Sequence, residues 1–336
     1  MNPLQDIQAA FGTLTANIAR FNPLALNVQI GRTIIAVSQL LTLTLTSWPN
    51  LTTDVAGRDA TAYCAGIRRA SLFCLGSDTP HMVGWWVGLF IALLVIGGIY
   101  PRLVAFLHAW LALSMNISLS LPDGGEVVAV FATILLIPVT FADPRACAWL
   151  RRDARASPHL RAVSYAGSIV LCIQLAGIYF ESGLAKLAVS DWVSGNALYY
   201  VLRDPYFGAS GTFGSILRWI TDQPVGTAVL TWGTPFIECA IAIFFLAPSR
   251  FKRYALAGVI VLHLGIAIAL GLWSFSLVMI GAATIASYTL RPAPKDSGHR
   301  IEQVESSGES EALVEDREIS ISGVRYEPRL NQPMPS

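Results

Sequence analysis

Residues 254–288 read YALAGVIVLHLGIAIALGLWSFSLVMIGAATIASY. They contain no Asp, Glu, Lys or Arg and one histidine, His263. A single α-helix of these 35 residues would be about 52 Å long, whereas the hydrocarbon core of a bilayer is about 30 Å thick. We therefore expect the stretch to cross a membrane twice and to turn near residues 271–274. An apolar hairpin of this kind predicts an integral membrane protein.

Six further apolar stretches precede this hairpin, and each approaches the roughly 20 residues that a spanning helix needs. They are residues 33–48, 82–100, 103–121, 127–141, 162–186 and 225–246. The sequence thus predicts an all-α fold, a polytopic membrane helical bundle of about eight transmembrane helices over residues 33–290. Residues 1–32 carry apolar side chains at helical spacing, which predicts an amphipathic interfacial segment.

The composition excludes a soluble globular protein, a disordered protein and a nucleic-acid-binding protein. Of the 336 residues, 54% are hydrophobic and 13% are charged, whereas soluble domains have about 25% charged residues. The formal net charge of +1 gives no basic surface for a nucleic-acid backbone, so the lipid bilayer is the expected partner and nucleic acid is not. Residues 291–336 hold six basic and nine acidic residues and few apolar ones, and we expect a disordered tail there.

The basic residues predict an orientation, because Lys and Arg concentrate in cytoplasmic loops. With the N-terminus inside, the cytoplasmic segments before the tail hold 11 Lys and Arg residues, and the outer segments hold six. An even number of spans then places both termini in the cytoplasm, and we expect a bacterial cytoplasmic membrane. Cys64 and Cys74 fall in the first outer loop, where a disulfide and two free thiols are both compatible with the spacing.

Ionisable residues at membrane depth are candidates for a functional site, because placing them in lipid is costly. Such residues are His108, Glu181, Lys186, Glu238 and His263, and no Cys and His spacing matches a zinc site. Lys186 ends an apolar segment on the outer side, where its amine could reach the headgroups or act as a base. Glu238 could be protonated, pair with another helix or line a wet cavity. A lone His is more often a hydrogen-bonded core residue than a catalytic one.

Two outer segments contain candidates for substrate binding. Asp123 and Glu126 flank a Gly-Gly turn and could hold a cation or a substrate, although turn formation alone also explains them. The aromatic segment 192–220 includes Trp192, Tyr199 and Tyr200. Aromatic residues of this kind occur at membrane interfaces and in pockets for lipid-like or peptide substrates.

The segment 179–187 reads YFESGLAKL and is followed by DWVSG at 191–195. This pattern resembles the central motif of the vitamin K-dependent γ-carboxylases and their bacterial relatives, the horizontally transferred transmembrane (HTTM) proteins. His263 followed by Phe275 and Met279 is similar to their placement of His, Phe and Met on adjacent helices. The resemblance covers roughly residues 33–287. It implies that Lys186 is the base that deprotonates a reduced quinone, and that Phe275 lies at the substrate.

Two shorter motifs resemble the sporulation-delaying protein B family within that group. They are SLFCL at 71–75 and Asp-Gly-Gly at 123–125. This resemblance implies a role in the maturation or export of a secreted antimicrobial peptide, beside a peptide precursor and a small membrane-associated partner protein. The catalytic candidates are then Lys186, His263, Glu238 and Glu181.

Other functions remain compatible with the same residues. One is a non-catalytic membrane chaperone, an export scaffold or an immunity scaffold, in which Lys186 pairs structurally with a carboxylate. A quinone-dependent enzyme similar to the carboxylases is another, and a transporter is a third.

Overall fold

The computed structural model describes residues 3–52, 64–75, 80–120, 124–150, 156–209, 211–288 and 290. In these ranges the chain is helical and has no strand, only isolated bridges between Phe21 and Leu290 and between Ile99 and Cys147. The longer helices are α1 (Pro3–Arg20), α2 (Leu26–Leu45), α4 (Pro80–Ile96), α5 (Pro101–Ser118), α6 (Gly125–Thr140), α7 (Pro158–Lys186), α10 (Gly211–Thr221), α11 (Pro224–Leu246), α12 (Lys252–Leu270) and α13 (Trp273–Ala286). The short ones are α3 (Trp48–Leu51), η1 (Gly66–Ala70), η2 (Leu72–Cys74), α8 (Ser190–Val193), α9 (Ala197–Val201) and η3 (Ser249–Phe251). The tail expected to be disordered lies outside the described residues.

A helix occupies each of the eight stretches in which the sequence predicts a span. Among the described residues, four helices are long and apolar enough to cross a membrane: α2, α7, α11 and the segment Ser249–Leu270. The helices α4, α6 and α13 are apolar but shorter. These helices indicate a membrane protein, while the number of eight spans stays a prediction.

The start of α2 differs from the predicted one at residue 33. The helix begins at Leu26, so Arg32 lies inside it rather than in a loop. Its side chain is 1% exposed, and a guanidinium nitrogen donates a hydrogen bond to Oε1 of Gln29 at 3.3 Å. The sequence pattern misplaced the boundary because a charge usually ends a lipid-facing run, whereas this Arg points into the protein.

Gly271 forms the turn that the sequence predicts within residues 254–288. It ends α12 in the left-handed region, with φ of 72°, and Trp273 begins α13 two residues later. Glycine adopts this conformation without the steric cost that a Cβ atom brings. The chain therefore folds back, and α12 packs against α13.

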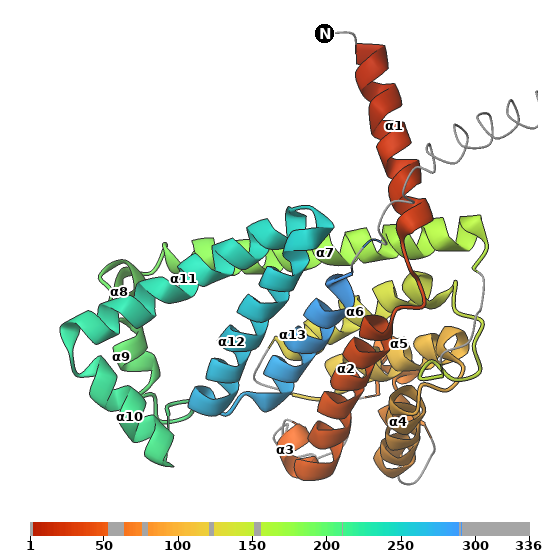
Figure 1. Cartoon of the computed structure of the whole chain (residues 1–336). Coiled ribbons are helices and arrows are strands. Elements are labelled where there is room, and N and C mark those ends of the chain that lie inside the picture. The colour runs from red at the N-terminus through yellow and green to blue at the C-terminus, as the bar shows by residue number, and fades with distance from the viewer. Residues whose placement is uncertain are drawn as a thin grey trace, which may run out of the picture. The chain divides into compact units, whose positions relative to one another are not determined.

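Packing contacts link neighbouring helices in the order α7, α11, α12, α13, α2 and α4, and α6 packs against α5 and α7 (Figure 1). Small residues allow the closest of these approaches. A Cβ atom placed on Gly31 of α2 would lie 2.5 Å from the carbonyl oxygen of Gly281 of α13. Close backbone contact at small residues is typical of helix packing in membranes.

The SLFCL segment is fixed against the bundle, and Cys64 and Cys74 form a disulfide. Leu72 and Phe73 are fully buried and belong to the apolar cluster that includes residues of α2, α4 and α5. The amide of Leu72 donates to the hydroxyl of Ser114 on α5 at 3.0 Å. Part of this motif therefore packs between the N-terminal part of α4 and the C-terminal part of α5.

Candidate functional site

Three polar side chains lie on one face of α7 near its C-terminal end. Tyr179, Ser182 and Lys186 are separated by three and four residues, a spacing that places side chains on the same side of an α-helix. Ser157 caps the N-terminus of the helix, because its hydroxyl accepts from the amide of Leu160, and the helix ends at Lys186. A cation in the last turn is favoured by the partial negative charge of the helix C-terminus.

Lys186 forms a two-pronged ion pair with Glu238 of α11. Its Nζ lies 2.8 Å from Oε2 and 2.9 Å from Oε1 of the carboxylate. The hydroxyl of Ser182 lies 2.8 Å from the same Nζ and donates to Oε1 of Glu238 at 3.1 Å. The side chains of Lys186 and Glu238 are 18% and 8% exposed, so protein atoms cover most of the pair.

An aromatic ring covers the ammonium on another side. The Nζ of Lys186 lies 5.3 Å from the centroid of a Trp192 ring, within the range of a cation–π interaction. Trp192 belongs to α8, and its carbonyl oxygen accepts a hydrogen bond from Trp232 Nε1 of α11 at 3.1 Å. The segment after α7 is thereby tied to α11, the same helix that supplies Glu238.

The approach of α7 to α11 depends on Gly183. A Cβ atom at this position would lie 2.9 Å from Sγ of Cys239 and 3.3 Å from the carbonyl oxygen of Pro235. Gly183 directly follows Ser182 and precedes Lys186 by three residues. Cys239 directly follows Glu238. The missing side chain therefore brings the two helices together at the level of the ion pair.

A second polar pair lies deeper along α7. The hydroxyl of Tyr179 and Nε2 of His263 on α12 are 2.8 Å apart. The imidazole also meets the ring of Phe275 on α13 edge-on, with ring centroids 5.1 Å apart. Tyr179 and His263 are both only 2% exposed, so the hydrogen bond is protected from water.

The ion pair and the Tyr179–His263 pair line one cavity of about 280 Å³. Its wall combines these polar groups with apolar side chains of α9, α12 and α13. A larger cavity of about 410 Å³ adjoins it and is lined almost entirely by apolar residues of α9, α10, α11 and α12. The two share the residues Leu198, Thr234, Leu262, Ile266 and Leu270. The arrangement can hold a polar group against Lys186 and an apolar group beside it.

Five of the residues predicted from sequence line the smaller cavity together: Lys186, Trp192, Glu238, His263 and Phe275. The other predicted residues lie elsewhere. Glu181 is exposed on another face of α7, and Glu126 is buried in the first turn of α6. Tyr199 and Tyr200 of α9 are 37% and 58% exposed, and neither lines the cavity. Asp123 lies outside the described residues.

Ser182 and Tyr179 contact the predicted site residues but were not themselves predicted from the sequence. Both stand in the YFESGLAKL segment, and their spacing from Lys186 was available as a signal. His108, the remaining ionisable candidate, lies away from the cavity, with Nε2 3.1 Å from Oε1 of Gln39. Within the described residues, no group of three or more His, Cys, Asp or Glu side chains could hold a metal ion.

Comparison with known proteins gives two relatives from Bacillus subtilis strain 168. The chain is 36% identical to the uncharacterized protein YitO over 255 residues, which cover 75% of this chain and 82% of YitO. It is 27% identical to the sporulation-delaying protein SdpB over 276 residues, 81% of this chain and 84% of SdpB. No family profile matches the chain, and no solved structure matches it.

Proposed function

The chain belongs to the same family as Bacillus subtilis YitO, and on this premise we propose that it acts in the maturation or export of a secreted antimicrobial peptide. The similarity to the sporulation-delaying protein SdpB supports this role, as does the resemblance of the 71–75 and 123–125 motifs. The partners would be a secreted peptide precursor and a small membrane-associated protein.

The proposed location is the bacterial cytoplasmic membrane, with eight spans and both termini in the cytoplasm. Four long apolar helices and three shorter ones support this arrangement, as does the excess of basic residues on the side assigned to the cytoplasm. In this orientation Lys186, at the C-terminal end of α7, lies toward the outer face, where a secreted peptide would be processed.

The observation that carries the proposal is the burial of the Lys186–Glu238 pair in the wall of a cavity. A lysine that only extended to the headgroups would not be held at 2.8 Å by a carboxylate of another helix. To act as a base, Lys186 must first lose a proton, and Glu238 is an acceptor within hydrogen-bond distance. We infer that Lys186 then accepts a proton from a substrate group that enters the cavity.

His263 and Tyr179 would orient the same substrate group from another part of the cavity wall. Their hydrogen bond fixes the imidazole, and Phe275 limits its rotation. The adjoining apolar cavity would receive an apolar side chain of the peptide. By the resemblance to the carboxylases, a reduced quinone is a candidate cofactor. The residues present suit it, because a hydroxyl group would meet Lys186 while an apolar tail occupied the larger cavity.

Restoration of a deletion strain tests the proposal. The gene would be deleted in the source bacterium and replaced by the wild type, Lys186→Ala or Arg203→Ala. The control Arg203→Ala breaks the ion pair with Asp222, which lies outside the cavity. Mass spectrometry of cells and medium would quantify precursor and mature peptide. We expect Lys186→Ala alone to abolish mature peptide when the yield is normalised to the amount of each variant in the membrane, and normal maturation by it would refute the catalytic role.

A non-catalytic scaffold is the second candidate, and the complete pairing of both charges favours it. Lys186 and Glu238 satisfy each other as a structural ion pair does, with Ser182 as a shared partner. In this case the chain would bind and pass on the peptide without chemistry. A gene for a secreted peptide beside the gene of this chain would support the peptide as ligand in both cases.

A further inference from the structure

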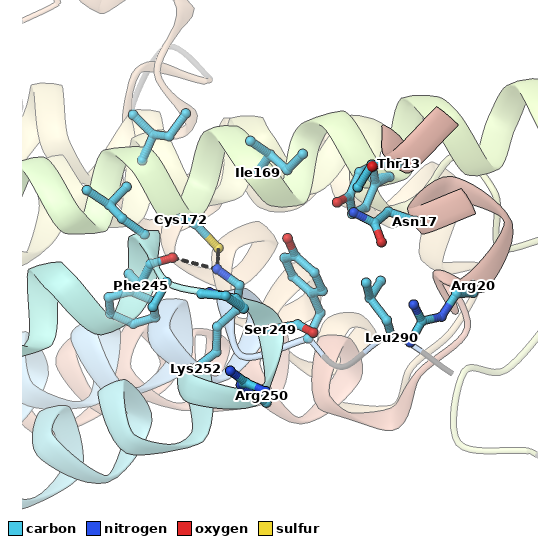
Figure 2. Close-up of a pocket in the computed structure, with 16 residues that line it drawn as sticks. Thr13, Asn17, Arg20, Ile169, Cys172, Phe245, Ser249, Arg250, Lys252 and Leu290 are labelled. Atoms are coloured by element: carbon cyan, nitrogen blue, oxygen red, sulfur yellow. Dashed lines mark hydrogen bonds between the residues drawn. The ribbon is translucent and has the colours of Figure 1, made fainter. Parts of the chain in front are cut away.

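A third cavity lies along the half of α7 opposite to Lys186, and it has a volume of about 910 Å³. Figure 2 shows residues of α1, of α7 and of the connection between α11 and α12 around it. The proposed peptide chemistry does not use this cavity. Its side chains nevertheless form a distinctive combination of charge and apolar surface.

Three cationic residues from three segments meet at this cavity. Arg20 ends α1, Arg250 belongs to η3, and Lys252 begins α12. Among the described residues that line the cavity, none is Asp or Glu. Like charges repel, so the convergence of three cations at one cavity favours an anionic ligand there.

Lys252 is the cation placed deepest in the wall. Lys252 is 4% exposed. Its Nζ donates hydrogen bonds to the carbonyl oxygen of Phe245 and to Sγ of Cys172 (Figure 2). Within the described part of the chain, no carboxylate forms an ion pair with it. An ammonium has three N–H donors, and a buried charge is costly unless an opposite charge compensates it. An anion in the cavity would supply that charge.

Uncharged donors surround the cations. Asn17 and Thr13 of α1 and Ser249 of η3 line the same cavity and are labelled in Figure 2. The amide of Asn17 and the hydroxyl of Ser249 can donate hydrogen bonds to the oxygens of a phosphate, whereas the hydroxyl of Thr13 donates to the carbonyl oxygen of Ala9. The cavity thus offers both the charge and the hydrogen bonds that a phosphate ester requires.

The rim of the cavity is apolar and open to the surroundings. Ile173 of α7 is 56% exposed and Leu246 of α11 is 65% exposed, and both line the cavity. On a helix that spans a membrane, such side chains face acyl chains. The nearby helix α1 also exposes Ile7 and Phe11, at 53% and 64%, as an interfacial helix does. A ligand here would meet cations at one end and lipid at the other.

We propose that this cavity binds the phosphate headgroup of an anionic phospholipid, with the acyl chains lying along Ile173 and Leu246. Arg20, Arg250 and Lys252 would hold the phosphate. These residues belong to the segments that the charge pattern assigns to the cytoplasm, where anionic lipids give the leaflet its negative surface. Soluble phosphate has the same charged group but no part that would use the apolar rim.

Lipid titration of the purified full-length protein in detergent tests this site. Dioleoyl phosphatidylglycerol and the zwitterionic dioleoyl phosphatidylcholine would be compared by native mass spectrometry and by thermal unfolding, with sodium phosphate alone as a third probe. The variants are Arg250→Glu, the milder Arg250→Gln, and Arg253→Glu. Arg253 is a matched control, because it is exposed, stacks on Tyr254 and does not line the cavity.

We expect phosphatidylglycerol to stabilise the wild type and Arg253→Glu more than phosphatidylcholine does. Arg250→Glu should bind phosphatidylglycerol about tenfold more weakly, and Arg250→Gln should show a smaller loss. Equal binding by the Arg250 and Arg253 variants would overturn the proposal, as would equal stabilisation by the two lipids. Full stabilisation by sodium phosphate alone would assign the cavity to a soluble anion and overturn the lipid.

Discussion

The hydroxyl of Tyr179 and Nε2 of His263 are 2.8 Å apart and connect α7 to α12 across the smaller cavity. This hydrogen bond restricts the imidazole while adding no charge to the site. Tyr179→Phe removes only the oxygen and leaves a buried histidine nitrogen without its partner, which costs about 1–3 kcal/mol of folding free energy. We expect the variant to insert into the membrane, melt at a lower temperature and produce less mature peptide. Peptide yield and melting temperature equal to those of wild type would show that the contact has no role.

The Lys186–Glu238 pair leads to a prediction that separates charge from chemistry. Lys186→Arg keeps the positive charge, but a guanidinium does not lose its proton in proteins. If Lys186 is a base, Lys186→Arg should fold and accumulate normally and yield no mature peptide. Full peptide yield from this variant would favour the scaffold. The readout is the ratio of precursor to mature peptide in cells and medium.

The same pair predicts a stability pattern that does not depend on the peptide. Lys186→Met or Glu238→Leu alone leaves one buried charge unpaired, which costs about 3–5 kcal/mol for a fully buried pair and less at this partial exposure. The double variant leaves neither charge and should recover most of the loss. Thermal unfolding in detergent measures this. If the double variant loses as much stability as both single variants combined, the pair is not coupled as the structure has it.

Gly183 and Gly177 form a matched pair on α7. A Cβ atom at Gly183 would lie 2.9 Å from Sγ of Cys239, whereas one at Gly177 would have no atom within 4 Å. Gly177→Ala should therefore stabilise the protein by up to about 1 kcal/mol through helix propensity. Gly183→Ala should destabilise it and reduce peptide yield, because α7 and α11 must separate at the ion pair. Adding Cys239→Ala to Gly183→Ala should restore part of the stability and part of the peptide yield. The absence of any such restoration would argue against this contact.

The disulfide of Cys64 and Cys74 provides a test of orientation. In the proposed topology it lies outside the cell. A membrane-impermeant phosphine added to intact cells should reduce it, after which both thiols should react with a maleimide that also stays outside. Cys147 serves as the internal control, because it lies in a segment assigned to the cytoplasm and should react only after lysis. The reverse labelling pattern would invert the topology.

Asp204 predicts a local pH dependence in the outer segment. Its Oδ1 accepts hydrogen bonds from the amides of Phe207 and Tyr206, and these bonds lower the pKa of the carboxyl group. A lowered pKa means that the carboxylate stabilises this turn above the ordinary pKa near 3.8 and that the stabilisation disappears as the pH falls below it. Cleavage at Tyr206 and Phe207 by pepsin, which is active at acid pH, should therefore increase below pH 3.8 in wild type, measured relative to a short peptide of the same residues. Asp204→Ala should be cleaved at a similar rate across that pH range, and a pH profile equal to wild type would exclude this role.

Hydropathy and helical spacing predicted much of the arrangement. The positions of the helices followed from apolar runs, and the turn at Gly271 followed from the length of a run that exceeds the membrane. Helical spacing on α7 also distinguishes the residues that face the cavity from those that do not. Glu181 is about 140° from Lys186 around the helix and lies outside the cavity, whereas Ser182 and Tyr179 share the face of Lys186.

The contacts between helices could not be predicted from the sequence in the same way. Glu238 is 52 residues from Lys186, and nothing in either segment specifies the register of α7 against α11. That register depends on Gly183 meeting Pro235 and Cys239, a three-dimensional fit of small and large side chains. Arg32 shows the complementary limit, because a charge inside an apolar run marks a loop or a buried contact with equal sequence evidence.

The left-handed turn at Gly271 also sets the positions of two residues that line the smaller cavity. His263 lies eight residues before it and Phe275 four residues after it, and the two rings meet only because the chain reverses there. Each residue added to α13 ahead of Phe275 would rotate that ring by about 100° around the helix axis. The connection between α12 and α13 therefore tolerates changes of residue type more readily than changes of length, and a relative that keeps this cavity should keep the number of residues between these two rings.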